Sequence, residues 1–185
     1  MVKEPRAGRV KTRLGRDIGM VRAAWWFRHR IAMLARAMQD PRWDTLLAVT
    51  PDTALSSRAL PPLPRIAQGP GDLGARMGHV FRTQPPGPVL IIGADIPGIT
   101  RAHIATGFRA LGSQDAVFGP AQDGGYWGIG LKRRPAIPAR LFQNVRWSSE
   151  HALTDTLASL PGLSVAYLPV LADVDVGSDL MRLSR

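Results

Sequence analysis

Short apolar runs alternate along the chain with amphipathic stretches, and loops rich in glycine and proline separate them. Continuous apolar runs of about four to eight residues predict buried strands, whereas apolar positions three and four apart predict helices with one buried face. We expect strands at residues 44–50, 65–67, 88–94, 115–121, 126–131 and 163–171, and helices at residues 19–39, 71–83, 100–111 and 148–160. Strands that alternate with helices in this way favour an α/β fold with a mostly parallel sheet.

The length of 185 residues suits one domain with a substantial core, and no linker divides the chain, so we expect a single domain over residues 1–185. No apolar run approaches the roughly 18 residues of a membrane span, and the amino terminus begins with charged residues. The sequence therefore predicts a soluble, cytoplasmic protein without a membrane partner. The absence of cysteine excludes disulfides, thiolate zinc sites and cysteine nucleophiles.

The net charge of +10 is concentrated near the amino terminus. Ten Lys or Arg residues lie within residues 1–36, against only Glu4 and Asp17. A basic patch of this kind suits an anionic partner, either a polyphosphate small molecule or a nucleic acid. General surface charge is an alternative explanation of the total, although not of the clustering around Gly8.

Asp95 directly follows the most continuous apolar run of the chain, in the sequence VLIIGADIPG. Ligands of open parallel sheets bind beyond the carboxyl ends of the strands, and we expect Asp95 at such an end. A carboxylate there is costly unless it is paired, hydrated or bound to a cation. Asp95 is therefore a candidate ligand for Mg²⁺ or Mn²⁺, which take carboxylate oxygens and bridge to phosphates. The alternative is a carboxylate that accepts hydrogen bonds from its own loop.

The stretch KEPRAGRVKTRLG places a glycine among basic residues near the amino terminus. Gly8 lets the backbone approach a ligand, while Lys3, Lys11 and Arg13 supply cations. This combination suits phosphate oxygens, although it lacks the Gly-Lys-Ser/Thr ending of a Walker loop. A basic tail without a ligand is the alternative.

Two further segments carry candidate polar groups. Asp123, Gly124 and Gly125 have the composition of a hairpin turn, and the adjacent Tyr126 offers a surface on which a sugar-like group could pack. Farther along the chain, Asp173 and Asp175 alternate at a strand end, so both need not face the same way. If one of them meets Asp95, two carboxylates could share a cation. Solvated acids at a strand terminus are the alternative.

Seven motifs in order resemble one bacterial family. They are VKEPRAGRVKTRL, VTPD, GDLGARM, LIIGADIPGI, GPAQDGGYWGIGL, VRWSS and DVDVGSDL. The family is of unknown function, is labelled glycosyltransferase A type or selenodomain-associated transferase-like, and is similar to 2-phospho-lactate guanylyltransferase and the molybdenum cofactor guanylyltransferases. The resemblance implies a nucleotide-diphospho-sugar transferase-like fold, a three-layer α/β/α sandwich around a mixed, mainly parallel sheet.

The same resemblance implies roles for individual residues. The catalytic residues would be Lys11, Arg13 and Asp95, and the metal ligands would be Asp95 and Asp175, with Asp173 as the alternative to Asp175. The nucleotide would contact Lys3, Gly8, Thr50, Asp52, Gly71, Leu73 and Gly74. The acceptor would contact Asp123, Gly124, Gly125 and Tyr126.

One departure from the related proteins concerns the first strand. Only Met1 and Val2 precede Lys3, whereas related nucleotidyltransferases begin with a full strand before the glycine-rich loop. We therefore expect most of this central strand to be missing, either because the start is assigned too late or because the domain is shortened and its phosphate loop poorly anchored.

The leading functional hypothesis is a metal-dependent nucleotidyltransferase that moves a nucleotidyl group from a nucleoside triphosphate to a small-molecule acceptor. Mg²⁺ or Mn²⁺ would bridge the phosphates, and Lys11 and Arg13 would offset charge on the departing pyrophosphate. A glycosyltransferase that uses a nucleotide sugar is the main alternative, and the sequence does not separate the two well. A non-catalytic module that binds a nucleotide or a nucleic acid is the third, although the acidic residues at strand ends argue against nucleic acid.

Overall fold

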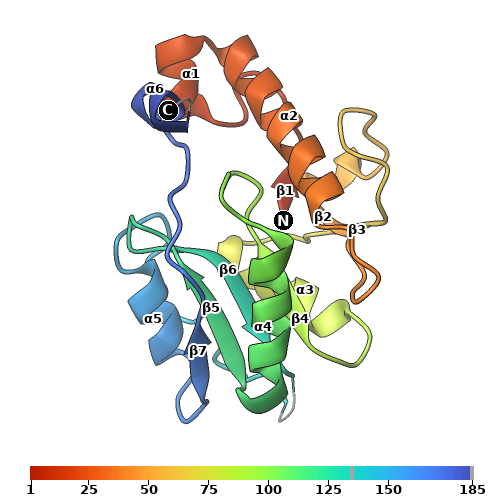
Figure 1. Ribbon diagram of the computed structural model, residues 1–185, viewed down its shortest axis with the longest axis vertical. Coiled ribbons are helices and arrows are strands. Elements are labelled where there is room, and N and C mark those ends of the chain that lie inside the picture. The colour runs from red at the N-terminus through yellow and green to blue at the C-terminus, as the bar shows by residue number, and fades with distance from the viewer. Residues whose placement is uncertain (134–135, 184–185) are drawn as a thin grey trace.

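The computed structural model describes residues 1–133 and 136–183. Its strands form two sheets in the middle of the molecule, whereas the sequence led us to expect one (Figure 1). The first sheet has the order β1-β2-β3, and all its strands are parallel. They are β1 (Val2–Lys3), β2 (Leu47–Thr50) and β3 (Arg65–Ala67). The strand β1 is only two residues long.

The second sheet is mixed and has the order β4-β6-β5-β7. Its strands are β4 (Val89–Ile92), β5 (Ala116–Pro120), β6 (Tyr126–Leu131) and β7 (Val165–Tyr167). β6 runs antiparallel to both β4 and β5, whereas β7 runs parallel to β5. The predicted α/β class with a mixed, parallel-rich arrangement is confirmed, but the strands form two sheets and not one.

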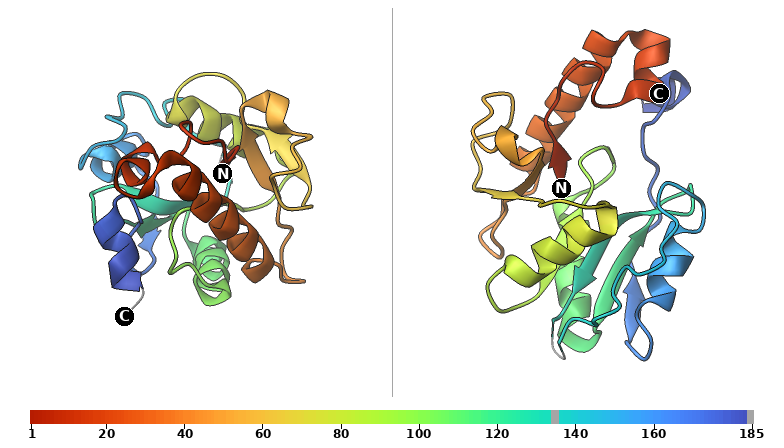
Figure 2. Two further views of the ribbon diagram at one scale, coloured as in Figure 1. Left: turned by 90° about the horizontal axis from the view of Figure 1, so that it is seen from above. Right: turned by 180° about the vertical axis from the view of Figure 1, so that it is seen from behind.

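Helices cover both faces of the sheets, as the front and back views show (Figures 1 and 2). They are α1 (Thr12–Ile18), α2 (Met20–Ala37), α3 (Leu73–Thr83), α4 (Arg101–Ser113), α5 (Ala152–Ala158) and α6 (Gly177–Leu183), with a short 3₁₀ helix at Asp52–Ala54. Among the described residues, no helix combines the length and the apolar character that crossing a membrane requires.

Two hydrophobic clusters fill the spaces between the layers. Val49 and Val117 pack toward α2 and α4, whereas their chain neighbours Ala48 and Phe118 pack toward α3. Successive side chains of a strand point to opposite faces, so each of these strands contributes to both clusters. This arrangement explains the continuous apolar runs in the sequence, because strands buried on both faces show no polar alternation.

Side-chain caps set the starts of two predicted helices. The Asp72 carboxylate accepts a hydrogen bond from the Ala75 N–H at 2.8 Å, as expected of an N-cap before α3. Thr100 caps α4 in the same way, and the His103 side chain in turn accepts from the Thr100 N–H, which completes a capping box.

Three helical features differ from the expectation. The helix α1 was not predicted, because its residues belong to the basic stretch that we interpreted as a phosphate loop. The helix expected over residues 148–160 begins only at Ala152, since residues 146–151 form a hydrogen-bonded loop. The strand expected over residues 163–171 is confined to β7, and the chain beyond it runs as an extended connection to α6 (Figure 1).

The Met1 amino group supplies a pH-dependent contribution to stability. Its ammonium donates to the Ile92 carbonyl at 2.6 Å, and burial lowers its pKa from 8.0 to about 6, although Asp95 acts in the opposite direction. Between pH 6 and 8 the unfolded chain therefore binds a proton that the folded chain does not. We expect the free energy of unfolding to rise by about 2–3 kcal/mol over this interval.

Urea unfolding from pH 5.5 to 8.5 measures this rise, with the amino-terminally acetylated chain as the control. The acetylated chain lacks the titrating amine but retains every histidine, so only the difference between the two profiles reports Met1. Parallel profiles would contradict the assignment.

Candidate functional site

The Lys11 ammonium lies between two carboxylates that are far apart in the sequence. Its Nζ atom is 2.8 Å from Asp95 Oδ2 and 3.5 Å from Asp175 Oδ1. Only 7% of the Lys11 side chain is exposed, whereas 35% of each carboxylate side chain remains accessible. The structure therefore brings together the three residues that the sequence nominated for metal binding and charge stabilisation.

A sharp turn of the backbone directs Lys11 to this position. Gly8 has φ of +73° and Lys11 itself has φ of +45°, a left-handed conformation that is uncommon for a residue with a side chain. Lys11 then forms the N-cap of α1, and its carbonyl accepts from the Gly15 N–H at 2.8 Å. The basic stretch is therefore a turn leading into a helix, and not a tail.

Asp95 stands just beyond the end of β4, as the sequence predicted. The Gly93 N–H donates to the Trp127 carbonyl at 2.8 Å, which keeps the chain aligned with β6 up to this point. A Cβ atom on Gly93 would lie 3.1 Å from Asp95 Oδ1, so the glycine leaves room for the carboxylate. Buried Ala94 and Ile96 on either side anchor this segment to the core, while the Asp95 side chain contacts Lys11.

Asp175 is held by contacts between α1 and the start of α6, which lie side by side in Figures 1 and 2. Its carboxylate accepts from Arg13 Nη1 at 2.7 Å, and its own N–H donates to the Asp179 carboxylate at 3.0 Å. Asp17 in α1 accepts from the Gly177 N–H at 2.7 Å. The end of the chain is thus fastened to the helix that follows the phosphate turn.

Sequence reasoning missed Asp17 and Asp179 as positioning residues. A signal existed for Asp179, because a carboxylate in the first turn of a helix readily accepts backbone N–H groups. Asp179 lies in the first turn of α6, which starts at Gly177. No sequence pattern could reveal Asp17, since its partner lies 160 residues away.

Asp173 adds a further negative charge near the same ammonium, and Asp123 lies near Asp173. Burial raises the pKa of Asp173, Lys11 opposes this rise, and the carboxylates of Asp123, Asp95 and Asp175 reinforce it. The Asp173 carboxylate therefore lies within electrostatic reach of Lys11 and of the other three carboxylates. Both acids of the DVDV segment take part, although the alternation along a strand allowed only one to be expected.

The turn at Asp123 is built as the sequence predicted. Gly125 donates to Asp123 Oδ1 at 2.9 Å, and Gly124 adopts φ of +83° between β5 and β6. A Cβ atom on Gly124 would lie 2.2 Å from the Glu150 carbonyl oxygen, so this glycine is required for close packing as well as for its conformation. The turn therefore rests directly on the loop before α5.

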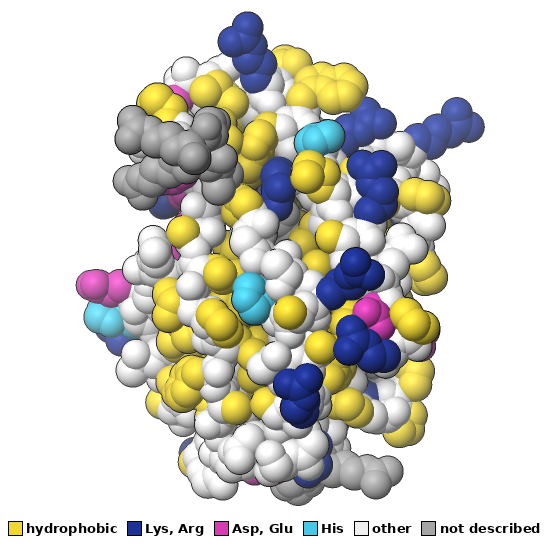
Figure 3. Space-filling view, in the orientation of Figure 1, with side chains coloured by type: hydrophobic (Ala, Val, Ile, Leu, Met, Phe, Trp, Pro, Cys, Tyr) yellow, Lys and Arg dark blue, Asp and Glu magenta, His cyan; other side chains and the backbone are white. Residues whose placement is uncertain are grey.

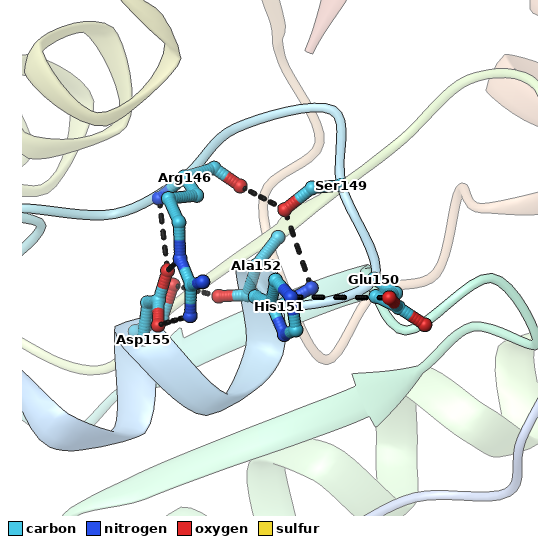
Figure 4. Close-up of polar contacts among 7 residues, drawn as sticks. Arg146, Ser149, Glu150, His151, Ala152 and Asp155 are labelled. Carbon is cyan, nitrogen blue, oxygen red and sulfur yellow. Dashed lines mark hydrogen bonds and ion pairs between the residues drawn. The ribbon is translucent and has the colours of Figure 1, made fainter.

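A compact hydrogen-bond network holds that loop in place (Figure 4). Arg146 donates from Nε to Asp155 Oδ2 and from Nη2 to Asp155 Oδ1, each at 2.9 Å. The Ser149 hydroxyl donates to the Arg146 carbonyl at 2.7 Å and accepts from the His151 N–H at 3.2 Å. The Arg146 guanidinium lowers the pKa of the Asp155 carboxyl well below its usual range. The network thus holds the loop on which the Asp123–Gly125 turn packs.

Tyr126, predicted to face the acceptor, directs its hydroxyl into the core. The hydroxyl lies 3.3 Å from Thr156 Oγ1, and the ring packs edge-on against Phe118. Burial raises the pKa of this phenol far above its usual value. The hydroxyl is therefore part of the interior and is not directed at the carboxylates around Lys11.

The residues nominated for nucleotide binding divide into two groups. Lys3 and Thr50 are paired in register at the ends of β1 and β2, and Asp52 follows on the same loop, where it accepts from the Gly69 N–H at 3.4 Å. Gly74 instead packs under the Phe142 and Trp147 side chains, where an added Cβ would approach to 2.7 Å. The structure brings together Lys3, Thr50 and Asp52, whereas Gly74 serves helix packing.

Gly71 and Leu73 lie at the start of α3. Gly71 has φ of +94°, and the Leu73 side chain is 46% exposed. Both are accessible from solvent, so neither is committed to the core.

The amino-terminal charge is only partly gathered at the carboxylates. Arg22, Arg28 and Arg36 are exposed on α2, and Figure 3 shows basic side chains over the upper and right parts of one face. Lys11 and Arg13 are directed to the acidic cluster instead. The basic residues that cluster in the sequence therefore form two groups in the structure. Lys11 and Arg13 pair with carboxylates, whereas the arginines of α2 are spread over the surface.

The donor set at Lys11 can hold a divalent cation only with help from a ligand or water. Among the described residues, no group of three or more His, Asp or Glu side chains has the arrangement of a complete metal site. Asp95 and Asp175 nevertheless contact one cationic atom from two sides. Two carboxylates of this kind suit Mg²⁺, which usually retains several waters and takes oxygens from substrate phosphates.

Comparisons with known proteins support the fold. No protein of curated function matches the chain. A crystal structure from Desulfovibrio desulfuricans G20, provisionally described as a nucleotide-diphospho-sugar transferase, is 29% identical, with a TM-score of 0.86 over 100% of this chain and 84% of its own.

Two mycobacterial structures share the fold at lower identity. Rv0371c from Mycobacterium tuberculosis H37Rv is 16% identical, with a TM-score of 0.52 over 85% of this chain and 82% of its own. Its homologue from Mycobacterium sp. strain JC1 is 18% identical, with a TM-score of 0.52 over 83% of this chain and 80% of its own.

The more specific similarity to guanylyltransferases stays a prediction. Residues 33–149 match the family described as uncharacterized proteins conserved in bacteria, DUF2064, and the chain belongs to that family.

Proposed function

We propose that this protein is a transferase that binds a nucleotide through its phosphates at the Lys11 cluster. The observation that carries the proposal is the Lys11 ammonium, held between Asp95 and Asp175 with Arg13 alongside. Fixed cations beside carboxylates form a site that can bind a polyphosphate and a divalent ion together. The likeness in fold to the Desulfovibrio protein, described as a nucleotide-diphospho-sugar transferase, agrees with a nucleotide substrate.

Nucleotidyl transfer is the reaction that we propose first. An oxygen of a phosphorylated acceptor attacks the α-phosphorus of a nucleoside triphosphate, and the bond from that phosphorus to the bridging oxygen of pyrophosphate breaks. Lys11 and Arg13 offset the negative charge that collects on the pyrophosphate. An acceptor that is already a phosphate anion carries no proton to remove, so this reaction needs no general base.

Asp95 and Asp175 would hold Mg²⁺ or Mn²⁺ in this proposal. When bound, the ion would neutralise phosphate charge and orient the substrate. Without substrate, Lys11 Nζ lies between the two carboxylates and offsets their charge. These ion pairs hold the two carboxylates close together, where they would be in place to hold the ion.

Glycosyl transfer is a second candidate, favoured by the description of the Desulfovibrio structure. Here a nucleotide sugar would lose its nucleoside diphosphate, and the same cations would stabilise that leaving group. The two reactions differ in their products, because only nucleotidyl transfer from a triphosphate releases pyrophosphate. Pyrophosphate release measured with a panel of the four triphosphates and several sugar phosphate acceptors, set against consumption of nucleotide sugars, distinguishes them.

Replacing Asp95 by asparagine tests the site directly. In the parent protein, we expect nucleotide with Mg²⁺ or Mn²⁺ to raise the melting temperature, because a ligand that binds only the folded state stabilises it. Asp95→Asn removes one carboxylate charge with little change of shape, so the metal-dependent part of the rise should disappear. Each protein is compared with its own ligand-free baseline in a thermal-shift assay.

Asp44→Asn is the matched control, since Asp44 is an exposed aspartate outside the Lys11 cluster. It should respond to nucleotide and metal as the parent does. An equal metal-dependent rise in Asp95→Asn and in the parent would remove Asp95 from the proposed site.

Replacing Lys11 by methionine tests whether its ammonium and a metal ion balance the same acids. Without metal, Asp95 and Asp175 lose their shared counter-charge, and we expect the free energy of unfolding to fall by about 1–3 kcal/mol. Mg²⁺ alone should then stabilise Lys11→Met more than it stabilises the parent, because the metal no longer competes with an ammonium. Urea unfolding with and without Mg²⁺ measures both effects.

Lys132→Met serves as the control for loss of a lysine, because Lys132 binds the Gly112 carbonyl at the surface. A parent and a Lys11→Met variant that respond identically to Mg²⁺ would show that the ammonium and the metal do not share these ligands.

A further inference from the structure

The outer side of α2 exposes large apolar side chains. Val21 is 60% exposed, Trp25 is 62% exposed and Met33 is 44% exposed. Residues four apart lie on the same side of a helix, so Val21 and Trp25 form one stripe, and Met33 lies beside it about two turns farther along. Phe27 and Ile31 are buried on the opposite side, in the core. The helix therefore has a second apolar surface, which faces solvent.

This surface lies at one end of the molecule. Figures 1 and 2 place α2 with α1 at the upper end, and both helices lie toward the viewer in the view from above. Basic and apolar side chains stand next to one another over the upper part of the face drawn in Figure 3. The 18 residues of α2 give it a length of about 27 Å, so its outer side is long enough to lie along a flat surface.

Positive charge accompanies these apolar side chains. The helix α2 contains no acidic residue, and Arg22, Arg28 and Arg36 are exposed on it. Among the described residues, none of these three arginines takes part in an ion pair. The nearest acids in the sequence, Asp17 and Asp40, accept hydrogen bonds from groups outside α2. We name the following exposed residues the α2 face: Val21, Arg22, Trp25, Arg28, Met33 and Arg36.

An aromatic ring and a guanidinium group lie together on the α2 face. The Arg28 guanidinium carbon is 5.1 Å from the centroid of the Trp25 ring, in a cation–π contact. Tryptophan is favoured where an apolar layer meets water, because its ring is apolar and its N–H is polar. A guanidinium binds phosphate oxygens through two parallel N–H groups. The pair therefore combines a group that suits the boundary of a membrane with a group that suits lipid phosphates.

The charge and the apolar side chains together distinguish the possible occupants of the α2 face. A second copy of the chain would bring two basic, acid-free helices together, and their like charges would repel. A nucleic acid would pair with the arginines, but its phosphate backbone offers no apolar surface to Val21 or Met33. An anionic membrane attracts the arginines through its headgroups and also takes up apolar side chains, so it matches both properties.

We propose that the α2 face docks on a membrane surface that contains anionic phospholipids. Its apolar side chains would enter the boundary between headgroups and acyl chains, and its arginines would bind lipid phosphates. A helix that lies on a membrane needs one exposed apolar stripe and no apolar run long enough to span it. The lack of such a run, from which we expected no membrane partner, therefore does not bear on this mode of binding.

Sedimentation of the full chain with vesicles tests the proposal without metal or nucleotide. Vesicles of phosphatidylcholine alone are compared with vesicles in which about one third of the lipid is phosphatidylglycerol. We expect the protein to sediment with the anionic vesicles and not with the neutral ones. Binding should weaken as salt is raised, because salt screens the attraction between the arginines and the headgroups.

Replacing Trp25 by serine tests the apolar part of the α2 face. We expect Trp25→Ser to weaken binding to the anionic vesicles about tenfold, because the exposed ring would leave water when the helix docks. Tyr167→Ser is the matched control, since Tyr167 is a 57% exposed aromatic residue on β7, outside the α2 face. Both variants should keep the melting temperature of the parent, because neither side chain is buried.

A double variant, Arg22→Gln with Arg36→Gln, tests the charge and leaves the contact between Arg28 and Trp25 in place. We expect it to weaken binding about thirtyfold, since each arginine near an anionic surface contributes about fivefold. The control is Arg109→Gln with Arg140→Gln, which removes the same charge from exposed positions outside α2. This control should bind within about twofold of the parent, because its arginines lie outside the docking surface.

Four results would overturn the proposal. They are no sedimentation with anionic vesicles, equal binding to neutral vesicles, losses in the α2 variants no larger than in their controls, and tighter binding to a labelled single-stranded DNA than to the vesicles. The last result would assign the α2 face to a nucleic acid instead. A dimer in analytical ultracentrifugation that Trp25→Ser abolishes would assign it to a second copy of the chain, and would equally end the proposal. Since no measurement involves metal or nucleotide, failure here would leave the proposed transferase function untouched.

Discussion

The Lys11 ammonium, enclosed by Asp95 and Asp175, is the interaction on which the arrangement of the site depends. A buried ammonium is unfavourable without compensating charge, and two carboxylates at a strand mouth repel each other without a cation between them. The attraction between the ammonium and the two carboxylates therefore offsets both the cost of burying Lys11 and the repulsion between the acids. Because the three residues come from the first turn, the end of β4 and the last segment, this one contact ties together the two ends of the chain and its middle.

The short helices beside the site, α1 and α6, pack together through polar contacts and through a small hydrophobic cluster of Leu14, Ala23 and Val174. α1 and α6 are short, and they meet through Asp17 and the Gly177 N–H at 2.7 Å, while Arg13 reaches Asp175 from α1. The extended connection after β7 could take many paths over the surface. These contacts hold the connection in one position, with Asp173 and Asp175 close to Asp95 and Asp123.

The molecule has two sheets whose strands are buried on both faces. Burial of β2, β4 and β5 on both faces requires helices on both sides, and α2, α3 and α4 provide them. β1 has two residues and pairs with β2, whereas β4 has four residues and pairs with β6. Each of the two hydrophobic clusters contains residues from both sheets, so the shared helix contacts hold the two sheets together.

The positions of most strands and helices, and of the β5–β6 hairpin, could be predicted from the amino-acid sequence. Apolar runs located the strands, the helices expected at residues 71–83 and 100–111 correspond closely to α3 and α4, and glycines at residues 124 and 125 indicated the hairpin. These signals depend on local backbone preferences and on burial. Helix α1 was hidden because basic residues obscure an apolar period, and the packing role of Gly74 required knowing that Trp147 lies above it.

The sequence by itself determined the class of fold and the kinds of charge available, since both follow from local pattern and composition. Tertiary structure alone decided that Lys11 contacts Asp95 and Asp175, that the Tyr126 hydroxyl is directed into the core, and that Asp17 supports the last helix. The physical reason is that these contacts join residues far apart in the chain. Their geometry is set by how whole layers pack, which no short stretch of sequence encodes.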